Sequence, residues 1–242
     1  MLLHAFPVNA RMWEPQLALV KTGWRVIAPQ MRGFDGGAGE PSAASIDDYA
    51  GDVVDLLDAL HVEEAVIGGL SMGGYVAFAL LRLAPRYVRG LVLADTRPQA
   101  DTAEGIEARR RMLALVRSKG AAAVADEMIP KLLADATRAE RPDIADRVRA
   151  LVLANPVEAI ASAIQVLMTR PDSTPLLSTI HCPTLILVGD ADGVTPPETS
   201  RQMQGAIAGS ELEVIARAGH LSSLEQPEAF NATVSRFLEH RV

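Results

Sequence analysis

The stretch IGGLSMGGY, residues 67–75, places one serine between two pairs of glycines. An apolar run precedes it and a helix-like run follows it, so it is typical of a turn from a buried strand into a helix. One interpretation is that Ser71 caps that helix, as serines often do. The other is that small residues at 69 and 73 let backbone segments approach closely, so that Ser71 projects its hydroxyl from a strained turn. A nucleophilic serine would also need a base, an acid that orients the base, and N–H donors for an oxyanion.

Short apolar runs alternate with amphipathic runs along most of the chain. This alternation predicts an α/β fold with a mostly parallel central sheet and helices on both faces. The expected strands are Arg25–Ala28, Ala65–Gly68, Val88–Ala94, Thr184–Val188 and Leu212–Ala216, with a stub at Met1–Leu3. The expected core helices are Ile46–Leu60, Met72–Leu83 and Pro227–His240.

Residues 97–175 contain no convincing strand. Four helical stretches are separated there by Gly120, Pro142 and the pair Asn155-Pro156, which we interpret as an N-cap and a first helical residue. A helical insertion between parallel strands lies over their carboxyl ends, where such sheets bind ligands. We therefore expect a lid at 97–175 between two parts of a core, 1–96 and 176–242. Its candidate substrate contacts, with ordinary packing as the alternative, are Met128, Ile129, Leu167 and Met168.

The composition limits the partners of the protein. With 242 residues, 49% of them hydrophobic, the chain can bury a large core. A net charge of −7 without a long basic tract argues against nucleic acid. No apolar run reaches the ~18 residues of a membrane span and no signal peptide is recognisable, so we expect a cytoplasmic protein with no membrane partner. The five histidines and single cysteine show no metal-ligand spacing, so neither a metal nor a cofactor is expected.

The base for Ser71 is found by elimination among the five histidines. His4 directly follows the stub Met1–Leu3, whereas His220 follows the predicted strand Leu212–Ala216 by a short loop. His220 therefore lies at the same sheet edge as the serine turn. A lone histidine is often structural, but one at that edge is a candidate general base.

Two carboxylates follow the predicted strand Thr184–Val188. We assign Asp192 as the acid, because it is further out in the loop and preserves the order serine, acid, histidine along the chain. Asp190 directly follows the turn glycine and is well placed to bond the loop backbone instead. Asp95, after the strand that ends at Ala94, is a third possibility, with turn capping as its alternative role.

An oxyanion needs backbone N–H donors. One candidate is the N–H of Met72, which follows the serine and opens a helix whose dipole favours negative charge. The second is the N–H of Phe6, in the loop after the stub strand; Pro7 has no N–H to donate.

Five segments in this order resemble the α/β-hydrolase superfamily over essentially the whole chain. They are LLHAFPVNARMWEPQ (2–16), APQMRGF (28–34), GGLSMGGYVAFAL (68–80), LILVGDADGVTPP (185–197) and AGHLSSLEQPEAF (218–230). Within the superfamily, the chain looks most like small bacterial esterases and oxoadipate enol-lactonase-like proteins. The resemblance implies a serine hydrolase that cleaves small carboxylic esters or lactones through an acyl-enzyme. Perhydrolase or lyase-like chemistry, or a binding protein without catalysis, are the alternatives.

The chain departs from the family pattern at three places. His4-Ala5 stands where members usually read His-Gly, and Gln30 where they usually carry aspartate. The hairpin that usually precedes the His4 strand is missing, so we expect either a truncated start or a shortened sheet, with the strand Arg25–Ala28 at its edge. Because an apolar edge with unpaired backbone groups is a liability, a second copy of the chain could cover it as a homodimer.

Overall fold

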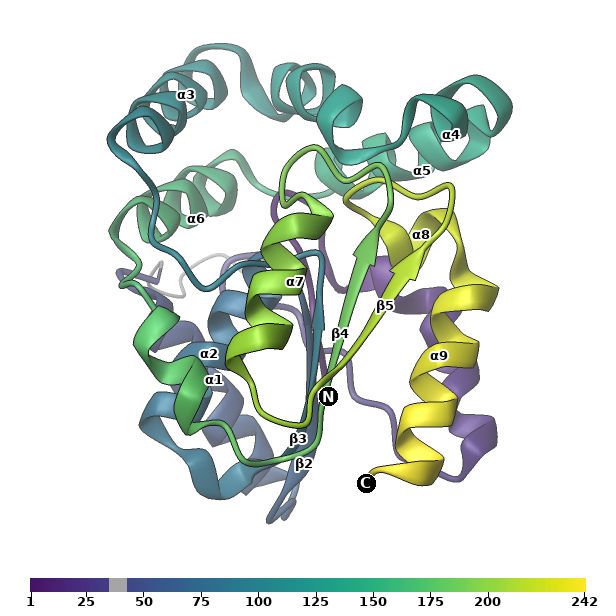
Figure 1. Cartoon of the computed structure of the whole chain (residues 1–242). Helices are drawn as coiled ribbons and strands as arrows, with labels where there is room; N and C mark the ends of the chain where they lie inside the picture. Colours follow the sequence, from purple (N-terminus) through teal and green to yellow (C-terminus); the bar gives the residue numbers. More distant parts are fainter. Residues whose placement is uncertain (35–42) are drawn as a thin grey trace.

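The centre of the molecule is a parallel sheet in a computed structural model that describes residues 1–34 and 43–242. Within these residues, five strands lie in the order β1-β2-β3-β4-β5, each parallel to its neighbour (Figure 1). They are β1 (Leu2–Leu3), β2 (Ala65–Leu70), β3 (Val88–Ala94), β4 (Thr184–Gly189) and β5 (Glu211–Ile215). Because all strands run the same way, their carboxyl ends share one edge of the sheet.

Helices cover both faces of this sheet, as the alternating pattern predicts. On one face lie α1 (Ile46–Ala59), α2 (Met72–Leu83) and α7 (Pro197–Ala206), and on the other lie α9 (Pro227–His240) and the 3₁₀ segment η1 (Ala10–Thr22) (Figure 1). The short elements are η2 (Pro85–Tyr87), η3 (Thr174–Thr179) and α8 (Ser222–Glu225). The predicted α/β class is confirmed, and the bounds of α2 and α9 agree with the sequence prediction.

The helical segment predicted as a lid lies over the carboxyl edge of the sheet (Figure 1). It consists of α3 (Ala103–Leu132), α4 (Asp135–Glu140), α5 (Pro142–Leu153) and α6 (Val157–Thr169). Gly120 breaks α3 with a φ of 76° and a ψ of −174°, so the predicted punctuation at this residue is correct. The predicted cap of α6 is wrong by one residue: Pro156 is the N-cap, and the side chain of Asn155 is used elsewhere.

The expected strand at 25–28 is absent from the sheet. The backbone there is joined to β1 by one bond, from Leu2 N–H to the Ile27 carbonyl at 2.7 Å. A strand needs a matching ladder beside it, and β1 covers only two residues, so no ladder forms. The homodimer inferred from this edge stays a prediction.

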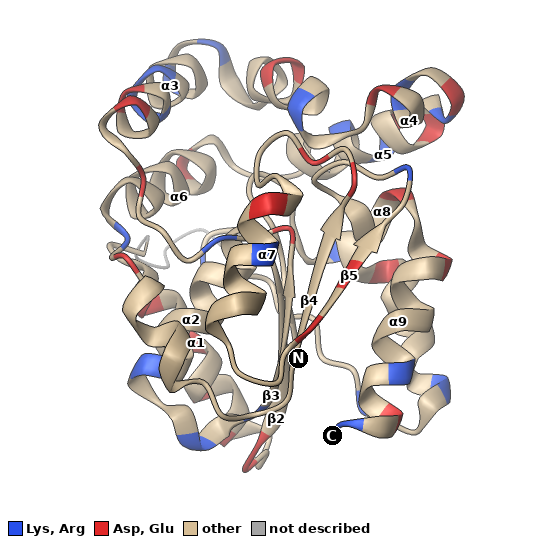
Figure 2. Cartoon of the chain, in the orientation of Figure 1, with Lys and Arg blue, Asp and Glu red and all other residues tan. Residues whose placement is uncertain are grey.

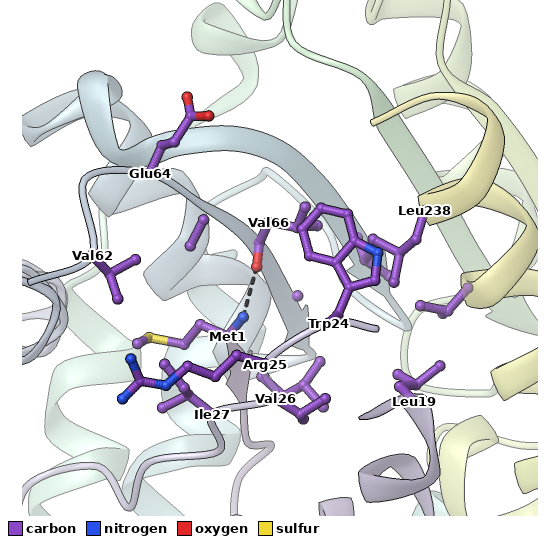
Figure 3. A pocket seen from close by; sticks show the side chains of 15 residues that line it. Met1, Leu19, Trp24, Arg25, Val26, Ile27, Val62, Glu64, Val66 and Leu238 are labelled. Atoms are coloured by element: carbon purple, nitrogen blue, oxygen red, sulfur yellow. Dashed lines mark hydrogen bonds between the residues drawn. The ribbon is translucent and has the colours of Figure 1, made fainter. Parts of the chain in front are cut away.

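An apolar cavity of about 220 Å³ lies at the opposite, amino edge of the sheet (Figure 3). Trp24, Val26, Val62 and Val66 contribute to its wall, and the amino group of Met1 donates to the Val66 carbonyl at 2.7 Å. The residues that line the cavity lie beside β1, β2 and β3, and none of them belongs to α3, α4, α5 or α6.

Charged residues of both signs are spread over the helices, whereas β4 carries none (Figure 2). In the described part of the chain, no single helix is long and apolar enough to cross a membrane. The helices α5 and α6 reach the necessary length and apolar composition only when taken together, and the chain bends by 94° between them.

Candidate active site

Ser71 occupies the turn between β2 and α2 in a backbone conformation that is rare for residues with a side chain. Its φ is 53° and its ψ is −111°. Ser71 is the N-cap residue of α2, yet its side chain makes no capping hydrogen bond. The strained turn of the second interpretation is present, and the hydroxyl is free to bond elsewhere.

The surrounding glycines are explained by backbone contact. A Cβ at Gly69 would lie 2.2 Å from the carbonyl carbon of Gly73, and a Cβ at Gly73 would lie 2.1 Å from the Leu3 carbonyl oxygen. At Gly74 it would lie 2.4 Å from the Thr96 hydroxyl. Because these glycines have no Cβ, the backbone of β1, β2 and the start of α2 can approach closely at the serine turn.

His220 reaches Ser71 from the loop after β5. Its Nε2 lies 2.8 Å from the Ser71 Oγ, and its Nδ1 lies 2.8 Å from the Asp192 Oδ2. With the proton on Nδ1, the ring donates to Asp192 and accepts from the Ser71 hydroxyl. The structure therefore brings the three predicted residues into one hydrogen-bonded chain, with His220 1% exposed and Asp192 4% exposed.

Asp192 is held by its own loop as well as by the histidine. Its Oδ1 accepts from the backbone N–H of Val194 at 2.8 Å and of Thr195 at 2.9 Å, and its Oδ2 accepts from the Thr195 hydroxyl at 2.6 Å. Burial opposes the charge on this carboxylate, but His220 and the Thr195 bonds outweigh it, so the pKa of Asp192 lies below its ordinary value. Asp192 is therefore an anion that can orient His220.

The other two candidate acids have different contacts. Asp190 is exposed and accepts from the Ala218 N–H at 3.2 Å, which is the loop-bonding role given to it as an alternative. Asp95 is fully buried, and its carboxyl bonds the Gly189 N–H and the Ser222 hydroxyl, not the histidine ring.

The two predicted oxyanion donors flank the serine turn. Met72 opens α2 directly after Ser71, and Phe6 lies in the loop after β1, which pairs with β2. In the described part of the chain, no hydrogen bond uses the backbone N–H of either residue. Both N–H groups therefore remain available to an oxyanion, which leaves their role a prediction.

His4 and Gln30 support the loop that carries Phe6. His4 is fully buried; its Nε2 accepts from the Met31 N–H at 3.2 Å and its Nδ1 lies 3.1 Å from the Ala5 carbonyl. Burial lowers the pKa of His4 to about 4, so the ring is neutral at neutral pH. Gln30 bonds the Ala10 N–H at 2.5 Å, which replaces the usual aspartate by a neutral bridge.

A cavity of about 520 Å³ lies between this loop and the lid. Its wall includes Phe6, the apolar side chains of Met112 and Leu115, and several charged residues of α3. Of the four predicted substrate contacts, Met128 lines the cavity. The other three pack in or against the core, as the alternative interpretation had it: Ile129, Leu167 and Met168.

Sequence reasoning missed two residues that hold the site together. The Thr195 hydroxyl donates to the Asp192 carboxylate and lies 3.3 Å from the His220 Nδ1. Its position three residues after the acid was the feature of the sequence that could have indicated this role. Glu225 accepts from the Gly219 N–H at 2.8 Å and from the Ala134 N–H of the lid at 2.9 Å; its place in the 218–230 motif was visible but had no assigned role. Among the described residues, no group of three or more His, Cys, Asp or Glu side chains could hold a metal ion.

The chain is similar to known proteins in sequence and in fold. The sequence profile of the alpha/beta hydrolase family matches residues 1–233. A 3-oxoadipate enol-lactonase of Acinetobacter baylyi is 31% identical over 229 residues, which cover 94% of this chain and 84% of the relative.

Two solved structures are similar over nearly the whole chain. A thermophilic esterase from Thermogutta terrifontis has a TM-score of 0.93 and 39% sequence identity, over 98% of this chain and 88% of the esterase. An enol-lactonase from Burkholderia xenovorans has a TM-score of 0.88 and 26% identity, over 99% and 90% of the two chains.

Proposed function

The chain belongs to the alpha/beta hydrolase family, and on that basis we propose that it hydrolyses small carboxylic esters or lactones through an acyl-enzyme on Ser71. The observation that carries the proposal is the hydrogen-bonded chain Ser71–His220–Asp192, with 2.8 Å at each of its two links. The esterases and enol-lactonases among the relatives support the same class of bond.

In the first half of the proposed reaction, the Ser71 Oγ attacks the carbonyl carbon while the His220 Nε2 takes the hydroxyl proton. Asp192 stabilises the imidazolium that forms. The N–H groups of Met72 and Phe6 bond the oxyanion, and His220 then gives its proton to the departing alkoxide oxygen.

In the second half, a water molecule attacks the acyl carbon and gives its proton to the same Nε2. The tetrahedral intermediate collapses, Ser71 recovers its proton, and the free acid leaves. In a lactone, the departing oxygen belongs to the same molecule, so the product is a single hydroxy or keto acid.

We propose that the substrate carries a carboxylate as well as the scissile bond. The 520 Å³ cavity is lined by four cations and two carboxylates: Arg97, Arg109, Arg111, Lys131, Asp101 and Glu127. The side chain of Asp101, 1% exposed, accepts from Arg97 at 2.8 Å and from Arg109 at 2.6 Å, and Arg170 lies 2.9 Å away. Three guanidinium groups share one carboxylate, so positive charge is in excess beside Phe6 and favours an anionic ligand.

A fluorophosphonate probe tests the acyl-enzyme proposal. We expect covalent labelling of the folded protein on Ser71, and none in Ser71→Ala. Among p-nitrophenyl esters of increasing chain length, a C4 ester should then be cleaved faster than a C12 ester, because the charged residues that line the cavity do not favour a long alkyl chain. Folded protein that neither reacts with the probe nor cleaves esters would support the non-catalytic ligand-binding alternative instead.

A further inference from the structure

The two residues that follow β3 contact all three segments of the site. Asp95 and Thr96 are both fully buried, at the carboxyl edge of the sheet between the serine turn and the end of β4. Asp95 has a φ of 44°, a left-handed conformation that is uncommon for a residue with a side chain. A non-glycine residue in this conformation at a sheet edge suggests a functional constraint.

The carboxyl group of Asp95 joins the acid loop to the base loop. Its Oδ1 accepts from the Gly189 N–H at 2.9 Å, and Gly189 in turn accepts from the Asp192 N–H at 3.2 Å. Its Oδ2 is hydrogen-bonded to the hydroxyl of Ser222, two residues after His220. One side chain therefore bonds the backbone that precedes the acid and the helix that follows the base.

Thr96 extends the same contact to the nucleophile. Its hydroxyl donates to the backbone carbonyl of Ser71 at 2.8 Å, and the side chain lies where a Cβ on Gly74 would be. The serine turn is thus held at its carbonyl by the residue next to Asp95.

We propose that Asp95 is a positioning residue, which with Thr96 sets the relative position of the three loops that carry Ser71, Asp192 and His220. The inference rests on the proposed function. It assigns Asp95 a role different from that of the triad acid, because among the described residues the bonds of its carboxyl go to Gly189 and Ser222 and not to the imidazole.

The electrostatics of the site disfavour the charged form of the Asp95 carboxyl group. Burial, together with the neighbouring Asp192 carboxylate, raises the pKa of Asp95 well above its ordinary value. A neutral carboxylic acid offers one acceptor and one donor, and the asparagine side chain offers the same pair. In Asp95→Asn the amide oxygen can still accept from the Gly189 N–H, and the amide nitrogen can donate to the Ser222 hydroxyl, which in the wild type donates to Asp95.

The test compares Asp95→Asn with Asp95→Ala, and with Asp192→Asn as the triad control. We expect Asp95→Asn to retain kcat within about threefold and to leave the pH profile unchanged. Asp95→Ala should lower kcat and the rate of fluorophosphonate labelling by roughly 10- to 100-fold with little change in KM, because displaced catalytic groups lose their alignment. A loss in Asp95→Asn as large as that in Asp192→Asn would overturn the proposal and make Asp95 an acid.

Two further variants keep the proposal testable if Asp95→Ala does not fold. Thr96→Val and Ser222→Ala each remove one hydroxyl and keep much of the shape. We expect each to lower kcat several-fold, and normal kcat in both would contradict the positioning role.

A readout independent of turnover separates this proposal from the proposed function. The low-field proton resonance of the His220 Nδ1–H bond should keep its position in Asp95→Asn and shift in Ser222→Ala. Wild-type protein inert to the fluorophosphonate would refute the acyl-enzyme, whereas an unmoved resonance in Ser222→Ala would refute the positioning role alone.

Discussion

The Nε2 of His220 lies 2.8 Å from the Oγ of Ser71, although the two residues are 149 positions apart in the chain. Ser71 stands at the end of β2 and His220 beyond the end of β5, two strands that do not touch. They meet because every strand is parallel and the connecting loops converge on one edge.

Replacing either residue by alanine should remove catalysis and leave the fold intact. We expect Ser71→Ala and His220→Ala each to lower kcat by on the order of 10⁴ or more, because the two act as one unit. Ester hydrolysis measures the loss, and the melting temperature checks the fold. Near-normal turnover in folded Ser71→Ala would contradict the assignment.

The choice of acid is tested by two substitutions two positions apart. Asp192→Asn should lower kcat by up to about 10⁴, since the amide no longer holds the Nδ1–H tautomer. Asp190→Asn is the matched control: this exposed side chain accepts from the Ala218 N–H of a loop, so kcat should change by less than about threefold. The reverse order of effects would show that the acid is Asp190.

The glycines of the turn differ from a helical glycine in the space around them. Gly69→Ala should destabilise the protein by about 3 kcal/mol or more, because the new Cβ would overlap the backbone of Gly73. Gly51→Ala, inside α1 with nothing within 4 Å, should instead stabilise it by about 0.5–1 kcal/mol. Urea denaturation measures both, and equal effects would refute the steric account.

The cationic cavity predicts a preference for anionic esters. Arg111→Gln should raise KM for the p-nitrophenyl monoester of succinic acid about fivefold, with KM for p-nitrophenyl acetate unchanged, and added salt should weaken the preference. Arg117→Gln, an exposed residue of the same helix, serves as the control. If Arg111→Gln raised the KM values of both esters by the same factor, a direct effect of the arginine charge on the anionic ester would be excluded.

His4 predicts acid sensitivity of the fold. Burial lowers its pKa from 6.5 to about 4, so between these values the unfolded chain binds a proton that the folded chain does not. The contribution of neutral His4 to the free energy of unfolding is therefore complete above about pH 6.5. It is lost as the pH falls towards 4, and the loss is on the order of 3 kcal/mol. His4→Gln should be less stable at pH 7 but lose less on going to pH 4.5, as measured by chemical denaturation. The exposed His181→Gln should behave as wild type.

The sequence alone was sufficient for features that depend on neighbouring residues. The periodicity of the apolar residues, together with the turn residues, predicted the first and last residues of α2, α9 and β3 correctly. The glycines around Ser71 indicated a strained turn. The order of strand ends was enough to nominate His220 and Asp192, because parallel strands must bring their carboxyl ends to one edge.

The tertiary structure decided the features that depend on contacts between distant segments of the chain. The run at 25–28 is apolar and β-branched like a strand, but β1, with two residues, is too short to form a ladder of hydrogen bonds with it. Asn155 could cap a helix by its local sequence, yet its amide donates to the Pro7 carbonyl 148 positions away. Asp95, Asp190 and Asp192 all follow strands, and their sequence positions do not distinguish them. The fold shows that Asp192 holds the histidine, Asp190 bonds a loop, and Asp95 joins two loops. These contacts join distant segments, and their geometry is set by the packing of the whole sheet, which no local pattern encodes.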